Sequence, residues 1–353
     1  MSANCIVGLV ILLLLGPLSA GPPRYAVQEV VYENGWVLNP AALTSDGTVL
    51  YSYGQSNYHF AYTWRDGVTT RVDLPWGIRG MNDLGTVIGN YGLDAAIWRE
   101  GQRTILDGPG RVTWSTDINN AGQVIGFLGE SPGDCGAYIW DNGEFTLLGS
   151  FGGLQTQATA VNSLGQVVGS SDLPDGTEHA TLWSDGQLFD LGTLGGSRSW
   201  AYDINDHGQI VGLASGLTGG SYPFLYENGV MTAIGPNRRH PYAINNSGQI
   251  VGLDDINGRA FLVEDGVMYD LSDLVVTGEI RSGHVTIATD INDYGQILAT
   301  GPRGRSLSVL TPIVPMTFHD QAVGVSNWSN SGNWSDQRAM GMGVPNSLVD
   351  VII

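Results

Sequence analysis

Residues 199–215 read SWAYDINDHGQIVGLAS, and this stretch decides the fold because it recurs along the chain with Asn205 as its fixed point. Other copies read RGMNDLGTVIG, STDINNAGQVIG, ATAVNSLGQVVG, PYAINNSGQIVG and TDINDYGQILATG, and a divergent copy, AALTSDGTVLYSYG, has Thr at this point. The fixed positions of units 1 to 7 are Thr44, Asn82, Asn119, Asn162, Asn205, Asn245 and Asn292. Their spacing of 37 to 47 residues indicates a repeat protein of seven units.

Each unit predicts four short β-strands. In unit 5 the expected strands are 200–204, 209–214, 223–226 and 230–234. Asn205 and Gly208 bound a tight turn between the first two strands, because Asn bonds its own backbone and Gly accepts a positive φ. A second turn, Glu227–Gly229, joins the last two strands, and we find no helical periodicity.

Four antiparallel strands in about 40 residues, repeated seven times, are typical of a β-propeller. We therefore expect an all-β, seven-bladed propeller. The last unit lacks a fourth strand, and Tyr25–Val31 is a strand without a unit, so their pairing would close the ring. The alternative is an open solenoid of β-meanders.

The repeats resemble the extracellular HAF repeats of bacteria, named for a His-Ala-Phe stretch before a Trp. Variants of that stretch are His179-Ala180-Thr181 and Pro223-Phe224-Leu225, and the INxxGQIVG core matches more closely. The resemblance spans roughly residues 36–315. It implies export and a propeller-like repeat, and no common activity.

The N-terminus favours a signal peptide over residues 1–20. Its apolar run, Ile6–Leu15, has the length of a signal-peptide core and is too short to span a membrane. An uncleaved anchor is the alternative, since no Lys or Arg precedes the run. After cleavage we expect no membrane span and a location outside the cell or on its surface. Cys135 would then be alone, which excludes an internal disulfide.

We place the propeller at residues 21–315 and a C-terminal extension at 316–353. The extension resembles the Trp-rich lead-in of exported β-helix or adhesin-like repeats through Gly332–Ser335, Pro345 and Asp350–Ile352. Two interpretations stay open: the truncated start of a further β domain, or a simple C-terminal flap.

Charge excludes several classes of partner. The chain has 15 basic residues, all Arg, against 34 acidic ones, for a net charge of −19. Such a charge repels phosphate backbones, so we expect no nucleic-acid partner. The lack of Lys also excludes a phosphate-loop lysine and Schiff-base chemistry.

Two motifs partly match known metal-binding and catalytic patterns, but each lacks a feature that the chemistry requires. Asp203-x-Asn205 begins like a calcium loop, as do Asp117-x-Asn119 and Asp290-x-Asn292, but the bidentate Glu at position twelve is missing. Residues 129–133 match G-x-S-x-G, but Pro132 has no N–H for an oxyanion hole. We therefore expect no metal site, no cofactor and no identifiable catalytic residue.

Large polar and aromatic residues outside the repeated pattern are the candidates for ligand binding, because repeated residues maintain the scaffold. They lie in the loops before the first strands: Trp114, Trp200, Arg238, Arg239 and His240. Trp stacks on sugar rings and Arg pairs with carboxylates, which points to an acidic glycan. Two adjacent Arg are costly to bury unpaired, so we expect exposure or pairing with Asp254, with Asp255 or with an external anion.

From the sequence we expect a secreted or cell-surface, non-enzymatic binding module whose partner is a carbohydrate or another surface protein. Two alternatives remain open. One is a glycan-active enzyme, a polysaccharide lyase or hydrolase, with its site at the mouth of the central channel. The other is a structural spacer of a longer surface protein.

Overall fold

The computed structural model describes residues 22–32, 37–55, 58–72, 77–109, 112–131, 134–278, 284–313, 317–318 and 334–335. The expected signal peptide and most of the expected C-terminal extension lie outside these residues. No helix in the described part of the chain is long and apolar enough to cross a membrane.

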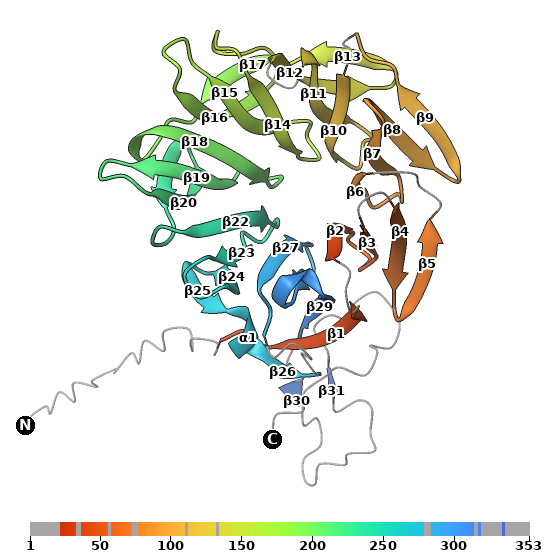
Figure 1. Cartoon of the computed structure of the whole chain (residues 1–353). Helices are drawn as coiled ribbons and strands as arrows, with labels where there is room; N and C mark the ends of the chain where they lie inside the picture. The colour runs from red at the N-terminus through yellow and green to blue at the C-terminus, as the bar shows by residue number, and fades with distance from the viewer. Residues whose placement is uncertain are drawn as a thin grey trace, which may run out of the picture.

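The chain forms antiparallel sheets arranged around a common centre (Figure 1). Unit 1 forms a four-stranded sheet of β2 (Val37–Leu43), β3 (Val49–Gln55), β4 (Tyr58–Arg65) and β5 (Val68–Val72). Unit 2 forms a four-stranded sheet of β6 (Ile78–Met81), β7 (Val87–Tyr91), β8 (Asp94–Arg99) and β9 (Gln102–Leu106). Units 3 and 6 do the same with β10 (Val112–Ile118), β11 (Val124–Ser131), β12 (Asp134–Asp141) and β13 (Glu144–Leu147), and with β22 (Arg239–Ile244), β23 (Ile250–Asp254), β24 (Arg259–Glu264) and β25 (Val267–Asp270).

Units 4 and 5 share one larger sheet. Its strands are β14 (Thr156–Val161), β15 (Val167–Asp172), β16 (Glu178–Ser184), β17 (Gln187–Asp190), β18 (Gly195–Ile204), β19 (Ile210–Gly216), β20 (Ser221–Glu227) and β21 (Val230–Ala233). The two units join through the parallel pairing of β16 with β18, whose register partners are Glu178 and Arg198. Each unit otherwise keeps its own four-stranded meander.

The last sheet combines both ends of the repeat region, in the order β26-β1-β29-β28-β27. Its strands are β1 (Tyr25–Tyr32), β26 (Val275–Thr277), β27 (Ile287–Ile291), β28 (Ile297–Thr300) and β29 (Ser306–Pro312). β1 runs antiparallel to β29, so the expected pairing of the N-terminal strand with unit 7 is present. Figure 1 shows the red β1 beside the blue β29.

The all-β class and the four-stranded sheets expected from the sequence are confirmed. Several short elements were not expected. β26 pairs in parallel with the outer side of β1, and β30 (Thr317–Phe318) pairs with β31 (Trp334–Ser335). A one-turn helix, α1 (Leu271–Leu274), follows Asp270, whose side chain accepts the N–H of Ser272 as an N-cap; a 3₁₀ turn, η1, covers Pro302–Gly304.

The repeated Asn is a turn residue whose carboxamide forms hydrogen bonds within its own unit and to the next unit. In unit 5, Oδ1 of Asn205 accepts the N–H groups of His207 and Gln209 at 3.1 and 3.0 Å. Its Nδ2 donates to Oε1 of Gln209 at 2.7 Å and to the carbonyl of Asn245 at 3.0 Å. Gly208 has a φ of 74°, as the turn prediction requires. The first three bonds shape the turn, and the fourth reaches the next unit.

This fourth bond recurs from unit to unit. Every repeated Asn donates its Nδ2 to the main-chain carbonyl of the next fixed residue, at 2.9–3.1 Å. The last of these bonds joins Asn292 to the carbonyl of Thr44, across 248 positions of sequence. All seven fixed residues are buried, so a donor that lost its partner would also lack water.

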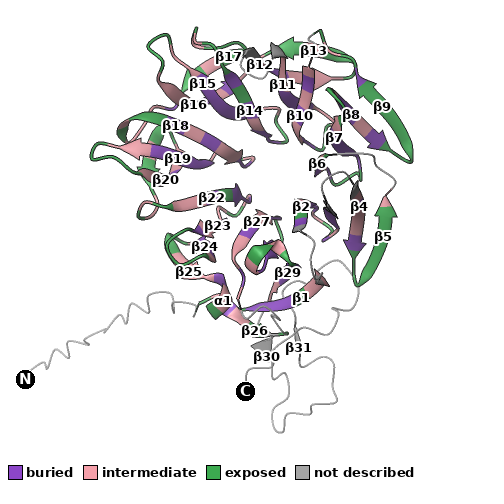
Figure 2. Ribbon diagram, in the orientation of Figure 1, coloured by how far each residue is buried: buried purple, intermediate pink, exposed green. Residues whose placement is uncertain are grey.

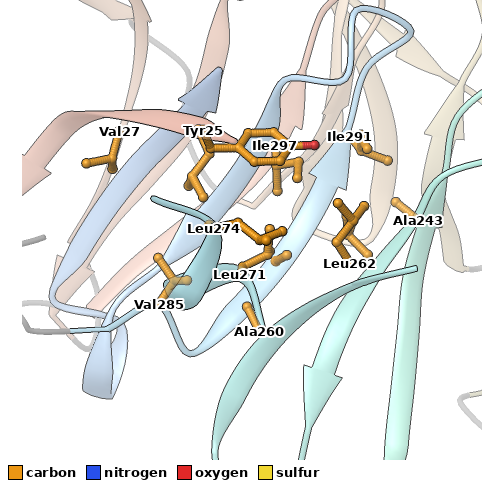
Figure 3. Packing of buried hydrophobic residues seen from close by; sticks show 14 residues of the cluster. Tyr25, Val27, Ala243, Ala260, Leu262, Leu271, Leu274, Val285, Ile291 and Ile297 are labelled. Carbon is orange, nitrogen blue, oxygen red and sulfur yellow. The ribbon is translucent and has the colours of Figure 1, made fainter. Parts of the chain in front are cut away.

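The second strand of each unit begins with two apolar residues, one on each face, and both are buried because both faces are covered there. In unit 5, Ile210 and Val211 point to opposite sides of the strand, and both are fully buried. Figure 2 shows this burial in purple, while the outer strands β5 and β9 are exposed. The largest apolar cluster packs Tyr25 and Val27 of β1 against units 6 and 7 and α1 (Figure 3).

The last Gly of the GQIVG motif lies on the second strand, at the point where the main chain of the first strand comes closest to it. A Cβ at Gly212 would lie 2.0 Å from the carbonyl oxygen of Trp200. The corresponding distances are 1.8–1.9 Å at Gly126, Gly169 and Gly252. A register irregularity in the first strand accompanies this approach in each of these units, so only Gly fits there.

We predict that Gly212→Ala lowers the free energy of unfolding by about 1–3 kcal/mol, because the methyl group must push two strands apart. Gly136→Ala is the matched control, since its Cβ would meet nothing closer than Cδ2 of Leu147 at 3.7 Å. Urea unfolding of both variants checks the prediction. Equal losses of stability in the two variants would show that close strand approach is not what the motif requires.

Candidate functional site

The turns between first and second strands of all seven units meet around one cavity of about 240 Å³, here called the mouth cavity. Three residues of each unit line it: the fixed residue and its two chain neighbours. In unit 5 these are Ile204, Asn205 and Asp206. The cavity is therefore built from the repeated motif itself.

The residues that follow the fixed positions form the rim of the mouth cavity, and they also bond from unit to unit. Main-chain N–H groups of Ser45, Ser163 and Asn246 donate to Oδ1 of Asp83, Asp206 and Asp293 at 2.7–2.9 Å. We call these three acids the rim carboxylates. Burial tends to raise the pKa of Asp206, but hydrogen bonds from Ser163 and Asn246 outweigh it, and the pKa is lowered.

Three further acids, here called the deep carboxyls, lie two residues before the fixed Asn in units 3, 5 and 7: Asp117, Asp203 and Asp290. Each accepts the main-chain N–H of its own next residue at 2.8 Å. Each also accepts an N–H from the following unit, donated by Val161, Ile244 or Leu43 at 2.7–2.9 Å. The deep carboxyls therefore link neighbouring units beside the mouth cavity.

Burial raises the pKa of Asp117 and of Asp290 to about 6, and it raises the pKa of Asp203 well above the usual value. Mutual repulsion contributes, because Asp203 feels the charges of Asp117 and Asp290. Asp290 also feels rim carboxylate Asp83. The pKa values of the deep carboxyls are therefore raised and that of rim carboxylate Asp206 is lowered, but only the rim carboxylates line the mouth cavity.

The structure places the five expected ligand-binding residues on first strands and the loop before them. Trp114 (β10) is half-buried and packs against Phe127, with ring centroids 5.4 Å apart. Trp200 (β18) and His240 (β22) occupy equivalent positions in neighbouring units, five residues before Asn205 and Asn245. None of the five is among the described residues that line the mouth cavity.

Neither of the two adjacent Arg residues is buried without an acidic partner. Arg238 is exposed, with a φ of 65°. Nη2 of Arg239 donates to Oδ2 of Asp254 at 2.7 Å, and Nε2 of His240 lies 3.2 Å from Oδ2 of Asp255. The expected pairing of Arg239 with Asp254 is confirmed.

Sequence reasoning missed the deep carboxyls as functional candidates. It noticed them only as the start of an incomplete calcium loop. The signal that could have found them is their alternation: Asp stands two residues before the fixed Asn in units 3, 5 and 7, and Ala or Gly stands there in the other units. Among the described residues, no group of three or more His, Cys, Asp or Glu is arranged to hold a metal ion.

Comparisons with known proteins identify the fold. No protein-family model and no curated protein matches the chain. The propeller domain of the Trilobed protease from Pyrococcus furiosus, described as having an open velcro topology, matches 81% of this chain and 93% of its own at 8% identity, with a TM-score of 0.53. This chain has a β-propeller fold.

Two further solved structures extend the comparison. A puromycin-hydrolysing peptidase of Mycobacterium tuberculosis matches 79% of this chain at 12% identity, with a TM-score of 0.52. This chain spans about half of that peptidase, 53% of its length. A gluconolactonase of Xanthomonas campestris matches 83% of this chain and 96% of its own at 11% identity, with a TM-score of 0.44.

These comparisons correct our functional expectation. The sequence led us to expect a non-enzymatic binding module. That expectation is wrong, because the propellers that match belong to a protease and a peptidase, and the enzyme alternative fits them better. The physical reason for the error is that a repeated motif looks like scaffold, whereas here it also builds the mouth cavity.

We predict that the protein loses stability as the pH rises from about 4 to about 6. A carboxyl group whose pKa is higher in the folded than in the unfolded chain binds its proton more tightly in the folded state. The stabilisation that this tighter proton binding gives is complete below pH 4 and is lost as the pH rises past 6. The free energy of unfolding then falls by on the order of 2 kcal/mol for each such group. Urea unfolding between pH 4 and 8 measures this slope.

Asp290→Asn and Asp117→Asn should each flatten that pH dependence, because they remove a titrating group. Asp66→Asn is the control. Asp66 lies in an exposed turn where units 3 and 5 carry Asn142 and Asn228. A slope that survives the removal of both Asp117 and Asp290 would assign the effect to other acids, among them the third deep carboxyl, Asp203.

Proposed function

We propose that the chain is a glycan-active enzyme, a hydrolase whose site is the mouth cavity. The observation that carries this proposal is a cavity lined by the rim carboxylates, with the deep carboxyls bonded just behind it to main-chain N–H groups of the lining residues Val161, Ile244 and Leu43. Deep carboxyls such as Asp290 keep a proton near pH 6, and rim carboxylate Asp206 ionises readily. The propeller fold shared with hydrolytic enzymes supports the proposal.

Hydrolysis of a glycosidic bond needs this pair of roles. A carboxylic acid gives its proton to the leaving oxygen, and a carboxylate on the other side of the sugar activates the attacking water. In the proposal a deep carboxyl is the acid and a rim carboxylate is the base. The cavity of about 240 Å³ is small, so it accommodates the end of a glycan rather than a long stretch.

The charge at the mouth cavity favours a hydrolase over a lyase. A lyase must neutralise the carboxylate of a uronic acid while a base removes the neighbouring proton. Among the described residues, neither Arg nor His lines the mouth cavity, whereas Asp83, Asp206 and Asp293 do. These acids repel a uronate, so the proposed substrate is a neutral glycan.

We propose further that the seven units are the blades of one closed ring and that the chain is an exported member of the HAF-repeat family. Two observations support closure. β1 pairs with β29, and the mouth cavity takes three lining residues from each of the seven units. The apolar N-terminal run and the repeated INxxGQIVG core support export and the family.

We expect the purified protein to release reducing ends from at least one neutral polysaccharide among starch, xylan, mixed-linkage β-glucan and chitin oligomers. Asp290→Asn or Asp117→Asn should lower the rate roughly 10²–10⁴-fold, because the general acid is lost. Asp66→Asn should leave the rate unchanged. A folded wild-type protein that is inactive on every substrate, or full activity in both deep-carboxyl variants, would refute the proposal.

Closure predicts unequal effects of truncating the two ends. Removing residues 21–31 deletes β1 and exposes the edge of β29, and it also removes the buried Tyr25. Removing residues 318–353 leaves the pairing of β1 with β29 intact. We therefore expect a large fall in melting temperature only for the first truncation, measured by circular dichroism. Equal melting of the two truncated proteins would contradict closure.

A further inference from the structure

Unit 6 contains a second cavity, of about 320 Å³, which shares no residue with the mouth cavity. Four charged side chains from β22 to β25 line it: Arg239, Asp254, Arg259 and Asp270. Phe261, Met268, Tyr269 and Pro236 add an apolar wall. We call this the unit 6 cavity.

The charges of the unit 6 cavity form two ion pairs. Nη2 of Arg239 donates to Oδ2 of Asp254 at 2.7 Å, and Nη1 of Arg259 donates to Oδ2 of Asp270 at 2.9 Å. The register of the sheet sets the first pair, because Arg239 and Asp254 are directly opposite each other in β22 and β23. The four formal charges of the lining therefore sum to zero.

The two carboxylates of this cavity each accept further hydrogen bonds, whereas two N–H donors of Arg239 have no acceptor among the described residues. Asp254 also accepts the N–H of Ile256 at 2.9 Å and Nδ2 of Asn257 at 3.2 Å, and Asp270 accepts the N–H of Ser272. Nε and Nη1 of Arg239 are buried and have no partner among the described residues. Only 15% of the Arg239 side chain is exposed.

Buried donors without acceptors are costly, and a charged group suffers most. Such a group in a native protein calls for an acceptor that the chain itself does not supply. Since the acids of the cavity are already bonded, the acceptor must bring its own oxygens. A carboxylate fits best, because guanidinium groups bind its oxygens with charge-assisted hydrogen bonds.

We propose that the unit 6 cavity binds a small organic acid, with its carboxylate on Arg239 and its apolar body against Phe261 and Met268. The apolar wall distinguishes this ligand from inorganic phosphate, which has no apolar part to bury. The proposal does not depend on the hydrolase proposed above, because the two cavities have no residue in common.

Benzoate is the probe for this cavity, with neutral benzamide and inorganic phosphate as comparisons, in isothermal titration calorimetry on the whole chain. We expect saturable binding of benzoate and at least tenfold weaker binding of the other two. The signal of the Met268 methyl group, labelled with ¹³C and assigned through Met268→Leu, should shift with benzoate. Binding without that shift would place the ligand elsewhere and overturn the proposal.

The double variant Arg239→Gln/Asp254→Asn removes the guanidinium without leaving a buried carboxylate unpaired. It should fold, as judged by circular dichroism, and bind benzoate at least tenfold more weakly. Arg103→Gln is the control, because Arg103 stacks on Tyr91 in unit 2 at 4.1 Å from the ring centroid. No benzoate binding by the wild type, unchanged binding by the double variant, or equal binding of phosphate would each overturn the proposal.

Discussion

The arrangement of this propeller depends on one carboxamide group, repeated in six of its seven units. The Asn side chain closes its own turn through Oδ1 and reaches the next unit through Nδ2. No smaller polar side chain combines two acceptor sites with two N–H donors in this way. Turn formation and attachment to the neighbouring unit are thereby coupled in a single residue, which explains why the motif tolerates change elsewhere and keeps its Asn.

This coupling also positions the candidate site. Because each turn is bonded to the next, the turns of all seven units line the mouth cavity. The deep carboxyls lie on first strands, just before these turns, and accept main-chain N–H groups of the following unit. The contacts between units therefore also hold the deep carboxyls in place. A site that lies at the contacts between repeat units is held rigid by the scaffold. The cost is burial of carboxyl groups close to one another, which appears as their raised pKa values.

Much of the fold could be predicted from the sequence, because each unit carries its own turn signals. The strand expected at 223–226 is β20 (Ser221–Glu227), and Asn228 and Gly229 adopt the positive φ values of the second turn. β26 and α1 could not be predicted, because they lie in the long connection before unit 7, where the repeat gives no register. Their positions depend on packing against β1 and unit 6.

The candidate site was harder to predict than the fold. Charge arguments found the pairing of Arg239 with Asp254, since two adjacent Arg need acids nearby. They could not find the orphaned Nε of Arg239, which depends on the exact path of one side chain. The interaction of Asp290 with Asp83 was equally hidden, because these residues of units 7 and 2 come near each other only in three dimensions.

The most direct test of this account is the stability of Asn292→Asp, which keeps the shape of the side chain and replaces the Nδ2 donor with an oxygen. That oxygen would face the carbonyl of Thr44 and Oε1 of Gln296. Asn228→Asp is the reference, since units 1, 4 and 6 carry Asp at that turn position, at Asp66, Asp185 and Asp265. At pH 8 the account predicts that Asn292→Asp lowers the free energy of unfolding by about 2–4 kcal/mol more than Asn228→Asp. It also predicts partial recovery at low pH, where the protonated acid can donate again. Equal stability of the two variants at pH 8 would contradict the account.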